Sequence, residues 1–133
     1  MNRYMSLLLW VGIGGALGAC ARYTVYVLAQ KWLGSSFPYA TLFVNTAGSA
    51  LMGLLSGTLA LKWHWSSEVQ AMVFVGMLGA FTTFSTFTLD VATLYQRNSW
   101  IKLMAYTSLS CVLPIAGMIA GLYTARLVMT KNS

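Results

Sequence analysis

Hydrophobic positions gather into four long segments that are separated by short polar connectors. The segments run from Leu7 to Leu28, from Tyr39 to Leu61, from Val69 to Leu94 and from Leu103 to Met129. Each is long enough to cross a hydrocarbon core of about 30 Å as an α-helix. The connectors leave no room for a domain outside the membrane. The pattern predicts an all-α integral membrane protein with four transmembrane helices (7–28, 39–61, 69–94 and 103–129), with residues 1–133 forming a single four-span membrane domain.

Composition agrees with a membrane location. The chain has 133 residues, of which 58% are hydrophobic and 8% are charged, whereas a soluble domain carries about 25% charged residues. The net charge of +6 is spread singly over the segment ends, where tryptophans also lie: Trp10, Trp32, Trp63, Trp65 and Trp100. This distribution is typical of a membrane interface and does not indicate a nucleic-acid-binding surface.

The cysteines and the histidine do not indicate a metal site. Cys20 and Cys111 lie inside apolar segments, and His64 is the only histidine. These ligands are too few for a structural zinc site. Two small buried thiols are favoured over a disulfide. The sequence around Cys20 loosely resembles a lipoprotein cleavage site, but apolar sequence continues after it, so a retained first span is expected rather than a signal peptide.

Positive charges give no preferred orientation in the membrane. With four spans, one side carries Arg3, Lys62, Arg126 and Lys131, and the other carries Arg22, Lys31, Arg97 and Lys102. Orientation normally follows the bias in lysine and arginine. A chain without bias is either oriented by something else or inserts both ways. We favour the second alternative, in which the two orientations pair as an antiparallel dual-topology homodimer.

Glycines recur at a spacing that suits close helix contact. Three pairs are separated by four positions: Gly14 and Gly18, Gly53 and Gly57, and Gly117 and Gly121. Small residues at this spacing let membrane helices approach closely. These glycines therefore predict the faces at which the helices pack.

The third segment contains an uncharged run of hydroxyls and rings. Residues 81–88 read Phe-Thr-Thr-Phe-Ser-Thr-Phe-Thr. Lipid penalises hydroxyls that lack partners, and a polar run at membrane depth commonly lines a path or binds a ligand. Gly76 and Gly79 precede the run, and such clusters are where membrane helices kink. The alternatives are a plain kink and a broken helix, whose freed carbonyls suit a hard cation and whose N–H groups suit an anion.

Other polar residues within the spans allow two interpretations each. Asn45 either makes an interhelical hydrogen bond or donates to an anion. Phe84 and Phe87 are three positions apart and share a helical face, where they either pack or turn positive ring edges toward an anion. Tyr106, Ser108 and Ser110 could extend a hydroxyl track, with Tyr106 and Ser110 one helical turn apart; the alternative is that each serine bonds back to a carbonyl of the preceding turn.

Acidic residues are too few for acid–base chemistry. Asp90 and Glu68 are the only two acids, and they do not form a paired-carboxylate arrangement. No nucleophilic set or phosphate-binding loop is present. We therefore expect no catalytic residue and no enzyme.

The chain resembles the CrcB/Fluc family of small fluoride channels over essentially its whole length. The resemblance rests on Gly18-x-x-x-Arg22, on Thr41-x-x-x-Asn45 and, most specifically, on Gly79-x-x-Thr82-Thr83-Phe84-Ser85-Thr86-Phe87. It implies a fluoride-selective channel of the cell (inner) membrane that passively exports fluoride and lowers its cytoplasmic concentration. It also implies two pores per antiparallel dimer and a structural sodium ion at the dimer centre.

The resemblance further implies roles for individual residues. The fluoride pore would be lined by Asn45, Phe84, Phe87, Ser110, Thr83, Tyr106 and Thr41. Backbone carbonyls of Gly79 and Thr82 at the break of the third helix would hold the sodium ion, and Arg22 would lie in the vestibule. Two residues depart from the family pattern, Ala80 in place of a second glycine and Pro114 in place of a further hydroxyl.

Two rival functions are compatible with four spans. A small multidrug transporter also inserts both ways, but it needs a membrane-embedded carboxylate to exchange protons for cations, and Asp90 is a poor substitute. A non-transporting membrane scaffold would use the hydroxyl run for packing alone.

Overall fold

The computed structural model describes residues 2–61 and 64–130, in which every regular element is a helix. The elements are α1 (Arg3–Leu33), α2 (Tyr39–Leu61), α3 (Ser67–Gln70), η1 (Ala71–Leu78), α4 (Gly79–Phe81), α5 (Phe84–Gln96) and α6 (Trp100–Thr130). The short elements from α3 to α5 follow one another along the third span. Four stretches are long and apolar enough to cross a membrane: Arg3–Leu33, Tyr39–Ala60, Ser67–Gln96 and Trp100–Thr130. An all-helical protein with four membrane-spanning helices is therefore confirmed.

Three of the four spans extend beyond the ranges expected from hydrophobicity. The first helix includes Arg3 at one end and Gln30 and Lys31 at the other, outside the expected 7–28. The third and fourth spans likewise exceed 69–94 and 103–129 at both ends. Helical geometry continues through the polar interface beyond the hydrocarbon core, so hydropathy alone marks only the apolar middle of each helix.

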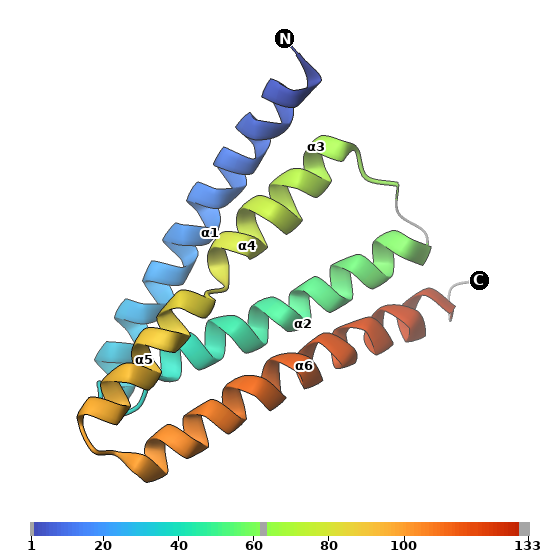
Figure 1. Cartoon of the computed structure of the whole chain (residues 1–133). Helices are drawn as coiled ribbons and strands as arrows, with labels where there is room; N and C mark the ends of the chain where they lie inside the picture. The colour runs from blue at the N-terminus through green and yellow to red at the C-terminus, as the bar shows by residue number, and fades with distance from the viewer. Residues whose placement is uncertain (1, 62–63, 131–133) are drawn as a thin grey trace.

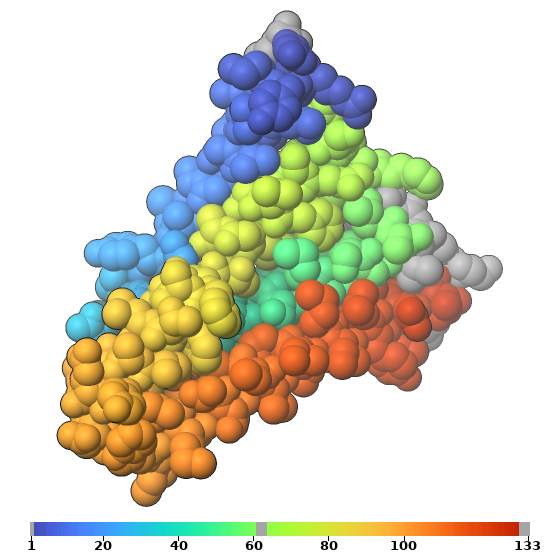
Figure 2. Space-filling model, in the orientation of Figure 1, coloured from blue at the N-terminus to red at the C-terminus, as the bar shows by residue number. Residues whose placement is uncertain are grey.

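The helices form two pairs that converge at one end of the molecule. In Figure 1, α1 lies along the third span and α2 lies along α6, and the pairs meet near α5 and diverge toward the opposite end. Figure 2 shows α2 only in the gap between the third span and α6. Because α2 has the largest buried share of the four spans, its side chains are the ones placed to bridge the other helices.

Glycines let α1 and the third span approach each other closely. A methyl group at Gly14 would collide with the carbonyl of Met72, and one at Gly18 would collide with that of Met77. Gly76 of η1 lies in turn against the backbone of α1. The expected packing role of the first glycine pair is therefore confirmed.

A second glycine-lined interface joins α2 and α6. Gly117 faces the backbone of Thr46, and Gly121 faces that of Ala50, so the two helices run in the same direction. Gly53 of α2 faces the backbone of α6 in the same way. Packing through bare backbone holds these two helices together, as the spacing of the glycines predicts.

Helix ends are set by local caps and turns. The side chain of Asn2 accepts from the Tyr4 N–H at 3.2 Å and begins α1. Gly34 ends it with φ 73° and donates its N–H to the Gln30 carbonyl, a left-handed conformation that glycine adopts without strain. Asn98, with φ 55°, makes the corresponding turn between α5 and α6.

The core is small and the outer surface is apolar. The largest fully buried side chains are Thr41, Val44, Leu78 and Tyr106, which come from α2, the third span and α6. Large apolar side chains cover the outside of the helices, as contact with lipid requires. Cys20 and Cys111 are both free and exposed on this surface. The expectation of buried thiols was wrong, because both positions lie on outward helix faces, but the absence of a disulfide between them agrees with it.

Candidate functional site

The third span changes its backbone conformation at Thr82 and Thr83. Thr82 has φ −81° and ψ 158°, and Thr83 has φ −156° and ψ 120°, so both residues are extended between α4 and α5. Any L-residue can adopt these angles. Gly79 and Ala80 are helical. The departure from the family pattern at Ala80 is therefore compatible with this geometry.

Asn45 of α2 binds both backbone groups of Thr83. Its Nδ2 donates to the Thr83 carbonyl at 2.9 Å, and the Thr83 N–H donates to its Oδ1 at 2.7 Å. In a continuous helix that N–H would bond to the carbonyl of Gly79. Of the two interpretations of Asn45, the structure contains the interhelical hydrogen bond, and donation to an anion stays a prediction. Its second amide hydrogen stays available for another acceptor.

The carbonyls of Gly79 and Thr82 lose their helical partners at this point. The Thr83 N–H, which would serve Gly79, goes to Asn45. The Thr86 N–H, which would serve Thr82, goes to the Thr83 hydroxyl at 3.2 Å and caps α5. Backbone carbonyls are ligands that a hard cation prefers. Within residues 2–61 and 64–130, no cluster of His, Cys, Asp and Glu is arranged to hold a metal ion.

Aromatic rings continue from this point into the core. The centroids of Phe84 and Phe87 are 5.3 Å apart, and those of Phe87 and Tyr106 are 5.5 Å apart. Phe84 is 76% exposed and Tyr106 is 0% exposed. The series therefore leads from the molecular surface to Tyr106, a fully buried side chain of α6. Each ring presents a positive edge without a fixed charge.

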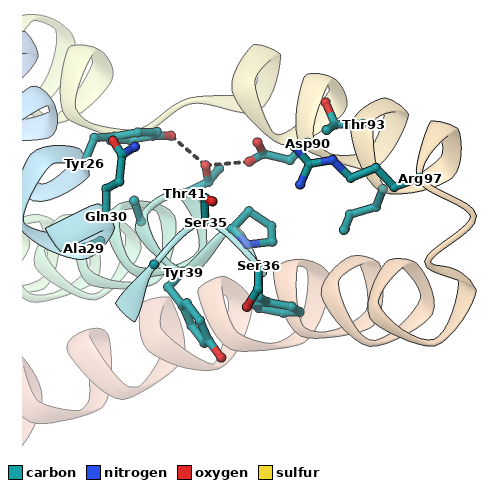
Figure 3. A pocket seen from close by; sticks show the side chains of 15 residues that line it. Tyr26, Ala29, Gln30, Ser35, Ser36, Tyr39, Thr41, Asp90, Thr93 and Arg97 are labelled. Atoms are coloured by element: carbon teal, nitrogen blue, oxygen red, sulfur yellow. Dashed lines mark hydrogen bonds between the residues drawn. The ribbon is translucent and has the colours of Figure 1, made fainter. Parts of the chain in front are cut away.

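A hydroxyl network surrounds the carboxylate of Asp90. Thr41 Oγ1 donates to Asp90 Oδ2 at 2.6 Å, and the Tyr106 hydroxyl donates to the same oxygen at 2.9 Å. The hydroxyl oxygen of Tyr26 lies 2.6 Å from Thr41 Oγ1. The single Thr41 proton is already directed to Asp90, so Tyr26 is the donor in that pair. Figure 3 shows Tyr26, Thr41 and Asp90 in this row.

A cavity of about 310 Å³ opens beside this network. Its lining includes Tyr26, Thr41 and Asp90 together with residues of the α1–α2 connection. Arg97, at the end of α5, extends its guanidinium toward the same space as Asp90 (Figure 3). The cavity therefore has hydroxyls, one carboxylate and one guanidinium on its walls.

A second cavity of about 280 Å³ lies beside the extended residues Thr82 and Thr83. Asn45, Thr83, Phe84, Ser110 and Pro114 contribute to its lining. The Ser110 Oγ is buried and has no hydrogen-bond partner in the described part of the chain. Pro114 lacks the N–H that would serve the Ser110 carbonyl one turn earlier. The Ser110 hydroxyl is therefore available to other groups.

Most residues named from the sequence lie in one continuous region. Thr41 and Tyr106 belong to the hydroxyl network, and Asn45, Thr83, Phe84 and Ser110 line the second cavity. Phe87 lies between them, Gly79 begins α4 and Thr82 follows its last residue. Arg22 is partly exposed on α1 and lines neither cavity.

Sequence reasoning missed two members of the network. Asp90 was considered only as a poor proton-exchange carboxylate, and Tyr26 was not considered. A signal for Asp90 was available, because it follows Phe87 by three positions and shares its helical face. Tyr26 carries no comparable signal, since its partner Thr41 belongs to another helix.

Comparison with known proteins shows one consistent similarity. Residues 9–122 match the family described as CrcB-like protein, Camphor Resistance (CrcB). A protein of Rhodospirillum centenum named fluoride-specific ion channel FluC is 45% identical over 122 residues, which cover 92% of this chain and 97% of that protein. Proteins of the same name from Nitrobacter winogradskyi and Caulobacter vibrioides are 41% and 44% identical, covering 92% and 93% of this chain and 98% of each relative.

Proposed function

The chain belongs to the CrcB family, and from this membership we propose that it forms a fluoride-selective channel. The similar proteins are named fluoride-specific ion channel, and this chain matches nearly the whole length of each. That name denotes a channel and not an enzyme, in agreement with the expectation from the sequence. The channel would export fluoride passively across the cell (inner) membrane and lower its cytoplasmic concentration.

The observation that carries this proposal is the composition of the second cavity. It combines the amide of Asn45, the unpartnered hydroxyl of Ser110 and the ring of Phe84. An amide N–H and a hydroxyl are donors that replace water around a small anion. None of the three carries a fixed positive charge, so the anion is bound without being trapped. Conduction requires binding of this moderate strength.

The rest of the pathway follows from the neighbours of this cavity. Fluoride would pass the edges of Phe84 and Phe87 and reach the hydroxyls of Tyr106 and Thr41. Both hydroxyls donate to Asp90, so an anion arriving there competes with a resident carboxylate for their protons. Thr83 contributes its hydroxyl at the start of α5, and Arg22 would attract anions at the entrance.

A structural sodium ion would be held by the carbonyls of Gly79 and Thr82. The donor set fits, because both carbonyls lose their helical partners to the bonds that Asn45 and Thr83 make. When bound, the ion would supply a positive charge that lowers the cost of an anion in the membrane. The residues of this chain contribute the geometry: Asn45 fixes Thr83, and Thr83 caps α5.

An antiparallel homodimer with two pores would complete the channel. Phe84 is 76% exposed on the monomer although it lies beside buried polar groups. A ring in that position needs a partner surface if it is to line a pathway closed to lipid. The equal numbers of positive charges on the two sides favour insertion in both orientations, which would supply the second subunit.

Fluoride efflux from liposomes tests the proposal directly. Purified protein is reconstituted, fluoride release is followed with an electrode, and chloride release is measured in parallel. Rapid fluoride release with little chloride release is expected. Folded protein that releases neither anion would contradict the proposal and favour a scaffold, whereas proton-driven movement of organic cations would favour the multidrug transporter.

A further inference from the structure

The α1–α2 connection places one more ring against the buried end of the aromatic series. Phe37 is partly buried although it lies outside any helix. Its ring centroid is 5.6 Å from that of Tyr106, at an interplanar angle of 88°. Its ring centroid also lies 4.8 Å from that of Tyr39. Phe37 therefore extends the series of Phe84, Phe87 and Tyr106 by a fourth ring, supplied by a different part of the chain.

This ring lies between the first cavity and Tyr106. Phe37 lines that cavity together with Thr41 and Asp90. Tyr106 hydrogen bonds to Asp90 and contacts Phe37, yet it lines neither cavity and is 0% exposed. Ser110, one helical turn further along α6, lines the second cavity. Tyr106 and Phe37 therefore lie among residues of the first cavity and one helical turn from a residue of the second.

The connection that carries Phe37 is anchored to α6. Lys102 Nζ donates to the Ser36 carbonyl at 3.0 Å, which joins the residue before Phe37 to the first turn of α6. Pro38 follows and restricts the backbone on the other side. The ring is therefore held in place by its neighbours in the connection as well as by its own contacts.

We propose that Phe37 is a specificity-determining residue of the fluoride pathway. The inference rests on the proposed function. With its ring in place, the passage beside Tyr106 is closed to water, so only an anion that exchanges its hydration shell for protein hydroxyls and ring edges passes. Removing the ring opens this passage to hydrated anions. The ring thus excludes chloride more strongly than it slows fluoride.

Fluoride and chloride efflux from the same liposomes tests this assignment with Phe37→Ala. The ratio of chloride to fluoride efflux is expected to rise about tenfold, the scale on which a changed apolar contact alters discrimination. Phe43→Ala is the matched control, because Phe43 is 57% exposed on α2, and it should leave the ratio unchanged. A ratio in Phe37→Ala equal to that of the unmodified protein would overturn the assignment.

Two further comparisons keep the result decisive. If Phe37→Ala does not fold, Phe37→Leu retains apolar volume without the ring, and a smaller rise of the same ratio is expected. An unchanged ratio in folded Phe37→Leu also overturns the assignment. Unmodified protein that releases no fluoride contradicts the proposed function itself, whereas selective release that is insensitive to Phe37 contradicts only the role of this ring.

Discussion

The side chain of Asn45 satisfies both backbone groups of Thr83, donating to its carbonyl at 2.9 Å and accepting from its N–H at 2.7 Å. The two residues are 38 positions apart and lie on different spans. A single amide thus compensates for the peptide bonds that leave the helix at this point, which lipid itself cannot do.

Replacing Asn45 with alanine should destabilise the protein substantially. Both Thr83 groups would lose their partners, and each unpaired buried group costs about 1–3 kcal/mol. We expect the free energy of unfolding in mixed micelles to fall by at least about 2 kcal/mol. Thr124→Ala is the control, because its exposed hydroxyl bonds only within its own helix. A comparable loss in both variants would argue against the special role of Asn45.

Thr83 should tolerate serine but not valine. Its hydroxyl accepts from the Thr86 N–H at 3.2 Å and caps α5, an interaction worth about 1 kcal/mol. Thr83→Val keeps the shape and removes this acceptor, so unfolding should become easier by about that amount. Thr83→Ser keeps the oxygen and should remain close to the unmodified protein. Equal stability of the two variants would show that the cap contributes little.

Substituting either pore phenylalanine with isoleucine should abolish fluoride efflux. Isoleucine retains apolar bulk but lacks the positive ring edge that an anion would approach. Phe84→Ile and Phe87→Ile are each expected to remain folded and to form dimers as judged by size-exclusion chromatography. Phe43→Ile, on an exposed face of α2, should conduct normally. Unchanged efflux in Phe84→Ile or Phe87→Ile would remove that ring from the pathway.

Asp90→Asn should retain fluoride efflux. The amide oxygen can still accept from Thr41 and Tyr106, which now donate to the carboxylate. We expect a decrease of no more than about tenfold, equivalent to about 1.4 kcal/mol on the barrier. Asparagine cannot exchange protons, so a transporter that couples proton and cation movement would stop. Loss of proton-driven organic-cation movement in this variant would support that rival mechanism, and complete loss of fluoride efflux in folded Asp90→Asn would contradict the expected tolerance.

Lys102→Met should weaken the anchor of the α1–α2 connection. Methionine keeps an extended apolar side chain but cannot donate to the Ser36 carbonyl. One exposed hydrogen bond is worth about 0.5–1.5 kcal/mol, so the ratio of chloride to fluoride efflux should rise by less than in Phe37→Ala. Lys31→Met removes an exposed lysine beside Trp32 and should have no such effect. A ratio that stays unchanged or falls would contradict the anchoring role of Lys102.

The spans could be predicted from the sequence because membrane crossing depends on a local property, the length of an apolar segment. The glycine pairs were equally readable, since close approach needs small residues at a regular spacing. The π-helical geometry of η1 carried no such signal. It accompanies packing against Gly14 and Gly18 of α1, and that contact depends on how two distant segments meet.

The hydroxyl and aromatic run of the candidate site could be recognised in the sequence, whereas the pairing of its residues and the part played by Asp90 and Tyr26 could not. The run around Phe84 drew attention because hydroxyls without charge are unusual at membrane depth. The network around Asp90 was not predictable, since its donors Thr41 and Tyr106 come from two other helices. The contact of Phe37 with Tyr106 depends on the course of the α1–α2 connection, which hydrophobic periodicity does not specify.

The two hydrogen bonds between Asn45 and Thr83 also affect the order in which the protein is assembled. Alone in lipid, the third span would minimise unpaired peptide groups by remaining a continuous helix. The Asn45 amide, which pairs with the backbone of the extended residue Thr83, belongs to the second span, and this span is synthesised before the third. We therefore expect the third span to enter the bilayer as a continuous helix. Its residues at Thr82 and Thr83 would become extended only when the span packs against α2, so the site would form during assembly of the helices in the membrane.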